Sequence, residues 1–390
     1  MSRNQYLIIT MNINLLKKLK SVPILLFLLP MILYFLGLFI LFFACDVDFL
    51  SFFKKQLIYL VVFLTIIFLL IVIDIRIIYR LSYFFFFTCI LLLIYAFFLG
   101  DSVMGARRWI DLLGVTFQPA ELMKVAVILS FSKFLNDNNI FLNKSSVICF
   151  INDKKSELMS KVNFLLYLLT NIFIIFLIFI QPDLGTSVIV LLLILMLFFV
   201  VACPIKYFVF LGLLFLCMIP VLWPYLKDYQ KNRILVFFNP SIDPKGSGYN
   251  ILQSKIAIGS GGFIGKGINN GTQSNLKFLP EYKTDFIFSH FAEETGFIGV
   301  FCLILLYVLL VMYLFFLADN VNNKFQKLVI LSFAILIFIH CFINISMTIG
   351  ILPVVGIPLP FISYGGSVTF CLVSCLGLSM NAYINKNVKL

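Results

Sequence analysis

The acidic residues that could act in catalysis lie mainly where a long polar segment meets an apolar run. Asp285 follows Thr284 at the end of the polar segment, and Glu293 and Glu294 lie inside the apolar run. A carboxylate at a membrane boundary can remove a proton from a substrate hydroxyl, and ionisable groups within a span are candidates for function. In the plainer alternative, Thr284 or Asp285 only caps a helix. Asp285 and Glu293 are eight residues apart, so we expect them near one helix face.

A second set of residues could supply positive charge for an anionic substrate. Arg107 and Arg108 are adjacent, and two guanidinium groups there could hold a pyrophosphate or simply anchor the chain at the membrane interface. Glu121 and Lys124 are three residues apart and predict an ion pair on one helix face. That pair is either structural or part of a substrate pocket. Arg233 is a further candidate for phosphate.

Two other polar stretches leave alternatives open. Asp183, between two apolar runs, either caps the helix that follows or lines the same cavity. The Gly-rich run Ser260–Gly267 could bind phosphate through backbone N–H groups, but it lacks the GK[ST] ending of a nucleotide-binding loop. A flexible loop is the plainer interpretation. The two histidines and nine scattered cysteines predict no metal cage.

The composition indicates that membrane-spanning helices position these residues. Of 390 residues, 62% are hydrophobic and 12% charged, whereas soluble domains hold about 45–50% apolar and about 25% charged residues. This excludes a soluble globular protein, a disordered chain and a nucleic-acid-binding domain. The apolar runs are continuous rather than alternating, which argues against an outer-membrane barrel. The net charge of +12 fits contact with anionic lipid headgroups.

The chain is therefore predicted to be an all-α integral membrane protein of ten transmembrane helices in one domain, residues 1–390. The basic segment 1–21 precedes an uncleaved first span and lies in the cytoplasm. Lys and Arg gather in the loops that this topology places inside, which supports both termini inside. Segment 227–285 is then a long outer-face loop between spans seven and eight, and the candidate residues meet at the outer face. The runs are about 22–43, 56–73, 82–100, 119–135, 163–181, 184–202, 207–226, 286–317, 328–350 and 366–384.

The polar stretches together resemble the SEDS family (shape, elongation, division and sporulation) of polytopic cell-wall proteins. The resemblance covers nearly the whole chain, and the segments 239–248 and 350–358 look like its RodA-like elongation branch more than its FtsW-like division branch. Three departures are Lys283 where His is common, Ala120 where Ser is common and Thr295 where Leu is usual. The matching motifs are Gly105-Ala106-x-Arg108-Trp109, Phe117-Gln118-Pro119-Ala120-Glu121, Gln181-Pro182-Asp183-Leu184-Gly185-Thr186, Ala257-Ile258-Gly259-Ser260-Gly261-Gly262, Thr284-Asp285-Phe286-Ile287-Phe288 and Pro358-Leu359-Pro360-Phe361-Ile362-Ser363-Tyr364-Gly365-Gly366-Ser367.

The resemblance implies a peptidoglycan glycosyltransferase of the bacterial cytoplasmic (inner) membrane, active at its outer, periplasmic face. Such an enzyme polymerises lipid II through β-1,4 bonds and releases undecaprenyl diphosphate, here for cell elongation and rod shape. The alternatives are a lipid II flippase and the division paralogue. Expected partners are a class B penicillin-binding transpeptidase and other elongation-complex membrane proteins, with no nucleic acid.

The resemblance also assigns expected roles to residues. It makes Asp285 the essential aspartate, for which we predict the role of general base. Arg107, Arg108, Lys124 and Arg233 are candidates to neutralise the leaving pyrophosphate, and Glu121 and Glu293 to line the cavity. A divalent cation, Mg²⁺ or Mn²⁺, is a candidate cofactor that would need substrate oxygens to complete its shell.

Overall fold

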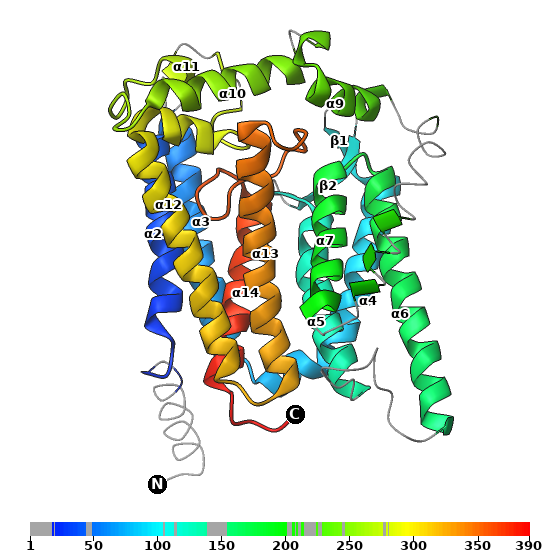
Figure 1. The fold of residues 1–390 in the computed structure, drawn as a ribbon. Helices are drawn as coiled ribbons and strands as arrows, with labels where there is room; N and C mark the ends of the chain where they lie inside the picture. The colour runs from blue at the N-terminus through cyan, green and yellow to red at the C-terminus, as the bar shows by residue number, and fades with distance from the viewer. Residues whose placement is uncertain are drawn as a thin grey trace.

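The computed structural model shows a bundle of helices that run roughly side by side, capped at one end by shorter elements (Figure 1). Among the residues that the structure describes, seven helices are long and apolar enough to cross a membrane, and a short apolar helix, α7, accompanies them. The predicted seventh span, about 207–226, lies almost wholly outside the described residues, as does segment 1–17. The structure describes residues 18, 20–43, 49–103, 106–112, 115–138, 154–200, 205–206, 208–209, 212–213, 224, 228–243, 246–275, 278–279 and 281–390.

The helix bounds follow the predicted apolar runs, although several helices begin earlier than hydropathy alone indicates. Helix α4 is an example. Asp74 caps it by accepting a hydrogen bond from the Arg76 backbone N–H (2.9 Å). Residues 75–81, which hydropathy predicts to be a loop between two apolar runs, therefore form the first turns of this helix. The elements of the bundle are α2 (Ile24–Phe43), α3 (Phe49–Val72), α4 (Ile75–Leu99), α5 (Pro119–Asp137), α6 (Lys154–Ile180), α7 (Leu184–Val200), α12 (Ile287–Asp319), α13 (Lys324–Ile349) and α14 (Gly366–Ile384).

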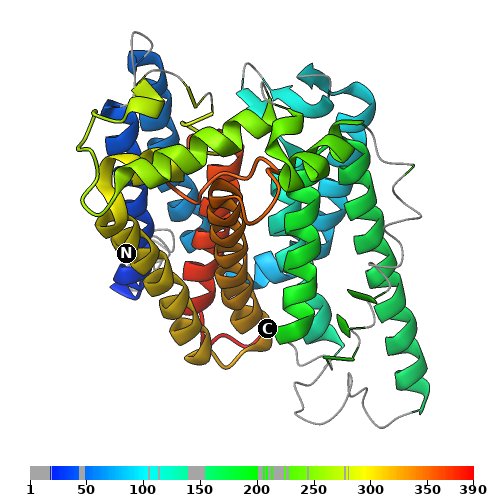
Figure 2. The same ribbon diagram turned by 45° about the horizontal axis from the view of Figure 1, so that its top comes forward.

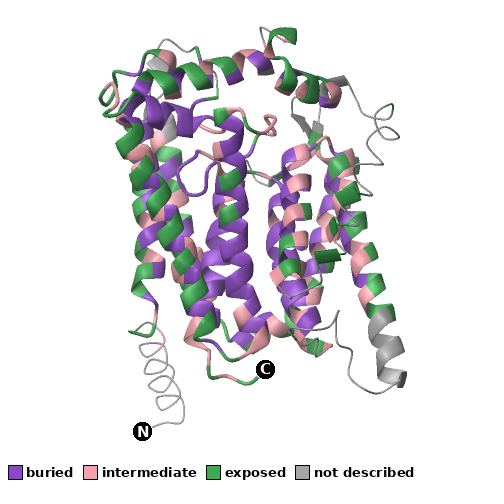
Figure 3. Ribbon diagram, viewed as in Figure 1, coloured by how far each residue is buried: buried purple, intermediate pink, exposed green. Residues whose placement is uncertain are grey.

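Helices α13 and α14 form the centre of the bundle, and the others shield them. In α13, 83% of the apolar stretch that is long enough to span a membrane is buried inside the protein, against 22% in α3 and 28% in α12. Figure 3 shows buried residues running the length of α13 and exposed ones along the outer faces of α2 and α12. In a membrane those exposed apolar faces are covered by lipid. The polar side chains of the central helices therefore face protein.

Helix α5 is enclosed in the same way, which explains why charged residues are tolerated in it. It packs against α4, α7, α13 and α14. Glu121 and Lys124 lie on this helix and are 2% and 0% exposed. Ionisable groups within a bundle are tolerated when they face protein and pair with each other.

The segments at one end of the bundle are folded rather than irregular, and we call this end the α10 end (Figures 1 and 2). The fold is therefore mostly helical but not purely so, since the described residues within 101–117 form a three-stranded antiparallel sheet in the order β1-β2-β3. The described residues of the predicted long loop form four helical elements at this end of the bundle. These elements are β1 (Asp101–Val103), β2 (Ala106–Leu112), β3 (Val115–Phe117), α9 (Asp228–Phe238), η2 (Pro240–Ile242), α10 (Ser247–Gly261) and α11 (Thr272–Asn275).

Helix α12 is interrupted at Gly296, where φ is 66° and ψ is −163°. The break is held by the run that follows α10: the N–H of Phe297 donates to the carbonyl of Gly262 (2.9 Å) and that of Ile298 to the carbonyl of Phe263 (3.2 Å). A Cβ at Gly296 would lie 2.3 Å from the Gly265 nitrogen, so only glycine fits. The segment before the break, which follows Asp285, is thus distinct from the apolar helix after it.

Candidate active site

Asp285 lies directly before α12 at the α10 end, and its backbone is fixed by α13. The Asn344 side-chain amide donates to the Asp285 carbonyl (2.9 Å) and also to the Ile357 carbonyl (2.6 Å). Gly356, with φ of 74°, faces the carboxylate: a Cβ there would lie 3.3 Å from Oδ2 of Asp285. The segment 350–365 between α13 and α14 therefore packs against the predicted base, which remains partly exposed.

The electrostatic environment of Asp285 suits a base that works near neutral pH. Burial raises the pKa of Asp285 from 3.8 to about 6, with Glu281 acting in the same direction and Arg233 and Arg108 in the opposite one. A general base is most effective when its pKa lies near the working pH. The structure thus brings three predicted site residues, Asp285, Arg108 and Arg233, into one electrostatic neighbourhood.

This environment predicts an acid limb in the rate of any reaction that uses the Asp285 carboxylate as a base. The deprotonated form is active, so the rate should rise with pH through about 6 and level off above it. Arg108→Gln removes a positive charge that lowers the Asp285 pKa, so the midpoint should move to higher pH. The measurement is the pH dependence of turnover for the wild type and the variant.

Arg107→Gln is the matched control for that prediction, because Arg107 is not among the groups that shift the Asp285 pKa. Its midpoint should equal that of the wild type. A midpoint that stays in place in the Arg108 variant, or moves equally in both variants, would contradict the electrostatic role of Arg108.

Asp183 caps the helix that follows it, which is one of the two roles that the sequence left open, and its place in the substrate cavity stays a prediction. Its Oδ1 accepts a hydrogen bond from the Thr186 backbone N–H (3.3 Å), which caps α7. The same oxygen lies 3.9 Å from Nη1 of Arg108, and the Gln118 amide donates to the other carboxylate oxygen. Asp183 is only 5% exposed. It therefore fixes Arg108 beside Asp285 from the start of α7.

The two adjacent arginines of β2 have different surroundings. Successive side chains of a strand point to opposite faces. Arg107 is exposed and donates to the Phe98 carbonyl (3.5 Å), whereas Arg108 faces Asp183. The Nε of Arg108 is buried and has no hydrogen-bond partner among the described residues. Of the two, Arg108 is the one that acts on Asp285 electrostatically, and a role for Arg107 stays a prediction.

Glu121 and Lys124 form the predicted ion pair, with Oε2 of Glu121 2.6 Å from Nζ of Lys124. Both side chains are buried, and Lys124 also lies 3.2 Å from Nε2 of His340 on α13. The pair therefore cross-links α5 and α13. These contacts do not test whether the pair also touches substrate, so that role stays a prediction.

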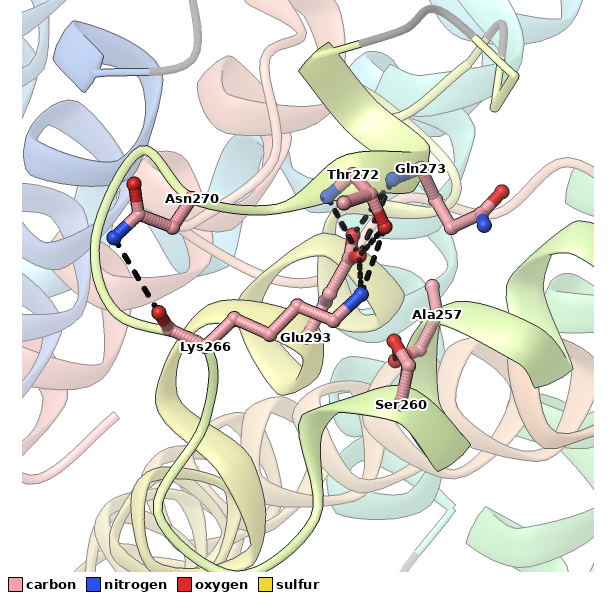
Figure 4. A network of polar contacts seen from close by, with 7 residues as sticks. All are labelled: Ala257, Ser260, Lys266, Asn270, Thr272, Gln273 and Glu293. Atoms are coloured by element: carbon pink, nitrogen blue, oxygen red, sulfur yellow. Dashed lines mark hydrogen bonds and ion pairs between the residues drawn. The ribbon is translucent and has the colours of Figure 1, made fainter.

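Glu293 binds the loop that follows α10 (Figure 4). Its carboxylate accepts hydrogen bonds from Nζ of Lys266 (2.6 Å) and from the Thr272 backbone N–H (2.8 Å) and hydroxyl (3.0 Å). The Gln273 N–H adds another at 3.2 Å. Glu294 binds the same loop by accepting from the Asn269 N–H (2.8 Å). These contacts make Glu293 an anchor for the loop, and its predicted place in the substrate cavity remains untested.

The Gly-rich run uses its backbone N–H groups within the protein. The N–H of Lys266 donates to the Glu293 carbonyl (3.0 Å), and that of Gly267 to the Glu294 carbonyl (3.0 Å). The glycines permit this close packing of two backbones: a Cβ at Gly265 would lie 2.1 Å from the Glu294 carbonyl oxygen. The run is therefore a packing element at the break in α12, and these N–H groups are not free for phosphate.

Glu293→Gln is expected to loosen this loop, because an amide cannot accept the same set of charge-assisted hydrogen bonds. Such bonds contribute about 1.5–3 kcal/mol each. Trypsin should then cleave after Lys266 at least several-fold faster than in the wild type. Asn270→Ala is the control, since the Asn270 side chain donates only a long bond (3.4 Å) to the Lys266 carbonyl, and its backbone bond to Gly267 is retained in the variant. Equal cleavage of the wild type and Glu293→Gln would argue against the anchor.

The sequence did not single out three buried polar residues that contact the site residues or their neighbours. Asn344, His340 and Gln118 are buried, and their roles emerge only from the packing of α13 and α5. A usable signal was present, because His340 and Asn344 are polar residues four apart in an apolar run and so share one helix face. No group of three or more His, Cys, Asp or Glu side chains among the described residues could hold a metal ion. The divalent cation that the sequence suggested would therefore need substrate oxygens to complete its shell, and it stays a prediction.

The fold and site define a polytopic membrane protein in which the Asp285 carboxylate lies near two guanidinium groups at one end of a helical bundle. A family model described as a cell cycle protein (FtsW, RodA and SpoVE) matches residues 17–388. The chain belongs to this family, and within it to the RodA-like members.

Curated relatives are similar over about three quarters of the chain. The peptidoglycan glycosyltransferase MrdB of Escherichia coli K12 is 39% identical over 301 residues, which is 77% of each chain. MrdB of Helicobacter pylori 26695 is 37% identical over 74% of this chain and 72% of its own. A probable peptidoglycan glycosyltransferase FtsW of Geobacter sp. M18 is 35% identical over 75% of each.

Solved structures share the fold. One is a chain in a structure described as "Structural coordination of polymerization and crosslinking by a peptidoglycan synthase complex", with a TM-score of 0.77 and 29% identity. It covers 93% of this chain and 98% of its own. The crystal structure of the rod shape determining protein RodA of Thermus thermophilus has a TM-score of 0.67 and 26% identity, over 93% and 97%.

Proposed function

We propose that this protein is a peptidoglycan glycosyltransferase that polymerises lipid II for cell elongation. The carrying observation is a carboxylate with its pKa raised to about 6, beside Arg108 and Arg233, at one end of the bundle. The names of the MrdB relatives support the same activity. The MrdB relatives are also more similar than the FtsW relative, 39% and 37% against 35% identical, which favours elongation over division.

In the proposed reaction, Asp285 accepts the proton of the acceptor sugar 4-hydroxyl. The freed oxygen attacks the anomeric carbon of the lipid-linked donor and forms the β-1,4 bond. The bond from that carbon to the pyrophosphate oxygen breaks, and undecaprenyl diphosphate leaves with both electrons of the bond. Arg108 and Arg233 neutralise charge that develops on the leaving group, and Asp183 holds Arg108 in place.

We further propose that the chain has ten spans and that the α10 end faces the periplasm, with both termini in the cytoplasm. Seven long apolar helices and the distribution of Lys and Arg support this topology. The C-terminus lies at the end of the bundle opposite α10 (Figure 1). In this orientation Asp285, α10 and the small sheet all stand at the outer headgroup level, where lipid II presents its sugars.

A class B penicillin-binding transpeptidase is the proposed partner, together with other membrane proteins of the elongation complex. The similarity to a chain of a peptidoglycan synthase complex supports a shared assembly for polymerisation and cross-linking. Substrate and partner are both membrane-bound, so the assembly would keep the growing strand next to the cross-linking enzyme.

The test of the proposed function is direct polymerisation. Purified protein, together with its transpeptidase partner, is incubated with labelled lipid II, and the glycan chains are resolved on a gel. Chains that form when the transpeptidase is blocked with a β-lactam, and that do not form with the partner alone, are the expected result. Transport of lipid II across vesicles without chain formation would instead support a flippase.

A further inference from the structure

A buried chain of polar contacts connects α5 to segment 350–365 through His340 of α13. His340 is 0% exposed. Its Nε2 lies 3.2 Å from Nζ of Lys124, and its Nδ1 lies 3.5 Å from the carbonyl oxygen of Pro358. The imidazole thus stands between the Glu121–Lys124 pair and the segment that packs against Asp285. Nothing in the proposed reaction uses this histidine.

The contacts of His340 favour one tautomer. An ammonium group has three donors and no acceptor, so the ring nitrogen facing Lys124 must carry the lone pair. The ring proton therefore sits on Nδ1, where it can be donated to the Pro358 carbonyl. A protonated imidazole would place an N–H group against the Lys124 ammonium, which is unfavourable in a buried site. His340 is thus a neutral link with a defined direction.

Asn344, one turn after His340, makes the parallel link on the same face of α13. Its amide donates to the carbonyls of Ile357 and Asp285. His340 and Asn344 therefore hold two consecutive carbonyls of one segment, those of Ile357 and Pro358. Gly356, the residue just before them, faces the Asp285 carboxylate. If the face of α13 that carries His340 and Asn344 shifted, the Lys124 ammonium would move relative to the residues around Asp285.

We propose that His340 is a positioning residue, which holds the Lys124 ammonium and segment 350–365 in fixed positions relative to Asp285. This inference rests on the proposed function, because these positions matter only to a reaction at Asp285. His340 would touch neither substrate nor the reacting atoms. Misplacement of a reacting group by about 1 Å can cost about 10²-fold in rate, so loss of the link should reduce polymerisation strongly.

The first experiment compares three substitutions in the lipid II polymerisation assay. His340→Gln can place an amide oxygen where Nε2 meets Lys124. His340→Asn can place an amide N–H near the Pro358 carbonyl but cannot reach Lys124, and His340→Leu removes both contacts. We expect His340→Gln to retain most activity, His340→Asn to lose at least several-fold and His340→Leu at least about tenfold. Ser332→Ala is the control. Ser332 is buried on the same helix, and its hydroxyl donates to the carbonyl of Leu328, one turn earlier in that helix (2.6 Å).

The outcomes separate positioning from simple packing. Equal activity of His340→Leu and the wild type would overturn the proposal, as would equal losses in His340→Gln and His340→Leu when both proteins are folded. If His340→Leu does not fold, the comparison of Gln with Asn decides: a more active Gln variant supports the link to Lys124, and equal activities refute it.

A second experiment tests the geometry without reference to activity. The chain has only two histidines, His290 and His340, so a ¹⁵N-histidine-labelled sample gives few imidazole signals, and His290→Gln assigns them. Nuclear magnetic resonance of His340 should show a protonated Nδ1 and an unprotonated Nε2, and Lys124→Met should shift the Nε2 signal. A protonated Nε2 would overturn the link. A wild-type protein that makes no glycan would refute the proposed function, while this measurement still decides the tautomer.

Discussion

Asp285→Asn is expected to reduce lipid II polymerisation by about 10²–10⁴-fold, the range typical of a lost general base. The amide has nearly the shape of the carboxylate, so the clearance at Gly356 and the bond from Asn344 to the Asp285 carbonyl are retained. What the variant loses is the ability to accept a proton at a pKa near 6. The measurement is the initial rate of glycan synthesis at pH 7.5, with the transpeptidase partner present.

The control for this prediction is Asp319→Asn. Asp319 is an exposed carboxylate at the far end of α12, where it pairs with Lys327 (3.1 Å), and its loss should leave the rate near that of the wild type. Thermal unfolding in detergent should be unchanged for both variants. An Asp285→Asn protein that polymerises at a near-normal rate would remove Asp285 from the role of base.

Lys124→Met is expected to lower the stability of the protein by about 3–5 kcal/mol, because it leaves the Glu121 carboxylate buried without its partner. Both residues of the pair are almost completely buried, and their charged atoms are 2.6 Å apart. Replacement of both charges, in Glu121→Gln/Lys124→Met, should recover most of the stability, since no unpaired charge remains. The measurement is thermal or denaturant-induced unfolding in detergent.

The same double variant separates the two roles that the sequence left open for this pair. A purely structural pair would let the double variant recover polymerisation along with stability, whereas a substrate contact would leave a stable but inactive protein. Lys327→Met is the control, because the exposed Lys327–Asp319 pair is of the kind that contributes about 0–1 kcal/mol. Equal stability of Lys124→Met and Lys327→Met would contradict the expected cost of an unpaired buried charge.

Much of the helical bundle could be predicted from hydropathy, because lipid imposes a length and an apolar composition on each span. The last span illustrates this, since 366–384 was predicted and α14 covers Gly366–Ile384. The segments outside the spans could not be predicted in this way. Strands β1, β2 and β3 pair within 101–117, and the described residues of 227–285 form helices that lie across the bundle, through contacts that no local pattern encodes.

The candidate site was predictable where a residue's chemistry stands out from its surroundings. Asp285, Arg108 and Arg233 are polar residues outside apolar runs, and the structure gathers them. Arg107 differs from Arg108 only in the face of β2 that it occupies, which depends on strand pairing. The anchoring contacts of Glu293 depend equally on a loop that returns to it. Spacing alone could indicate neither outcome.

The break in α12 at Gly296 also bears on how the enzyme would tolerate different membranes. A continuous helix that tilts to match a thinner or thicker bilayer carries its end with it. Here the run after α10 bonds to both sides of the break: to the carbonyls of Glu293 and Glu294 before it, and to the N–H groups of Phe297 and Ile298 after it. A change in the tilt of the apolar part of α12 would therefore pull on that run as well. The lipid chain length that sets the tilt is in this way coupled to the end of the bundle that carries the carboxylate.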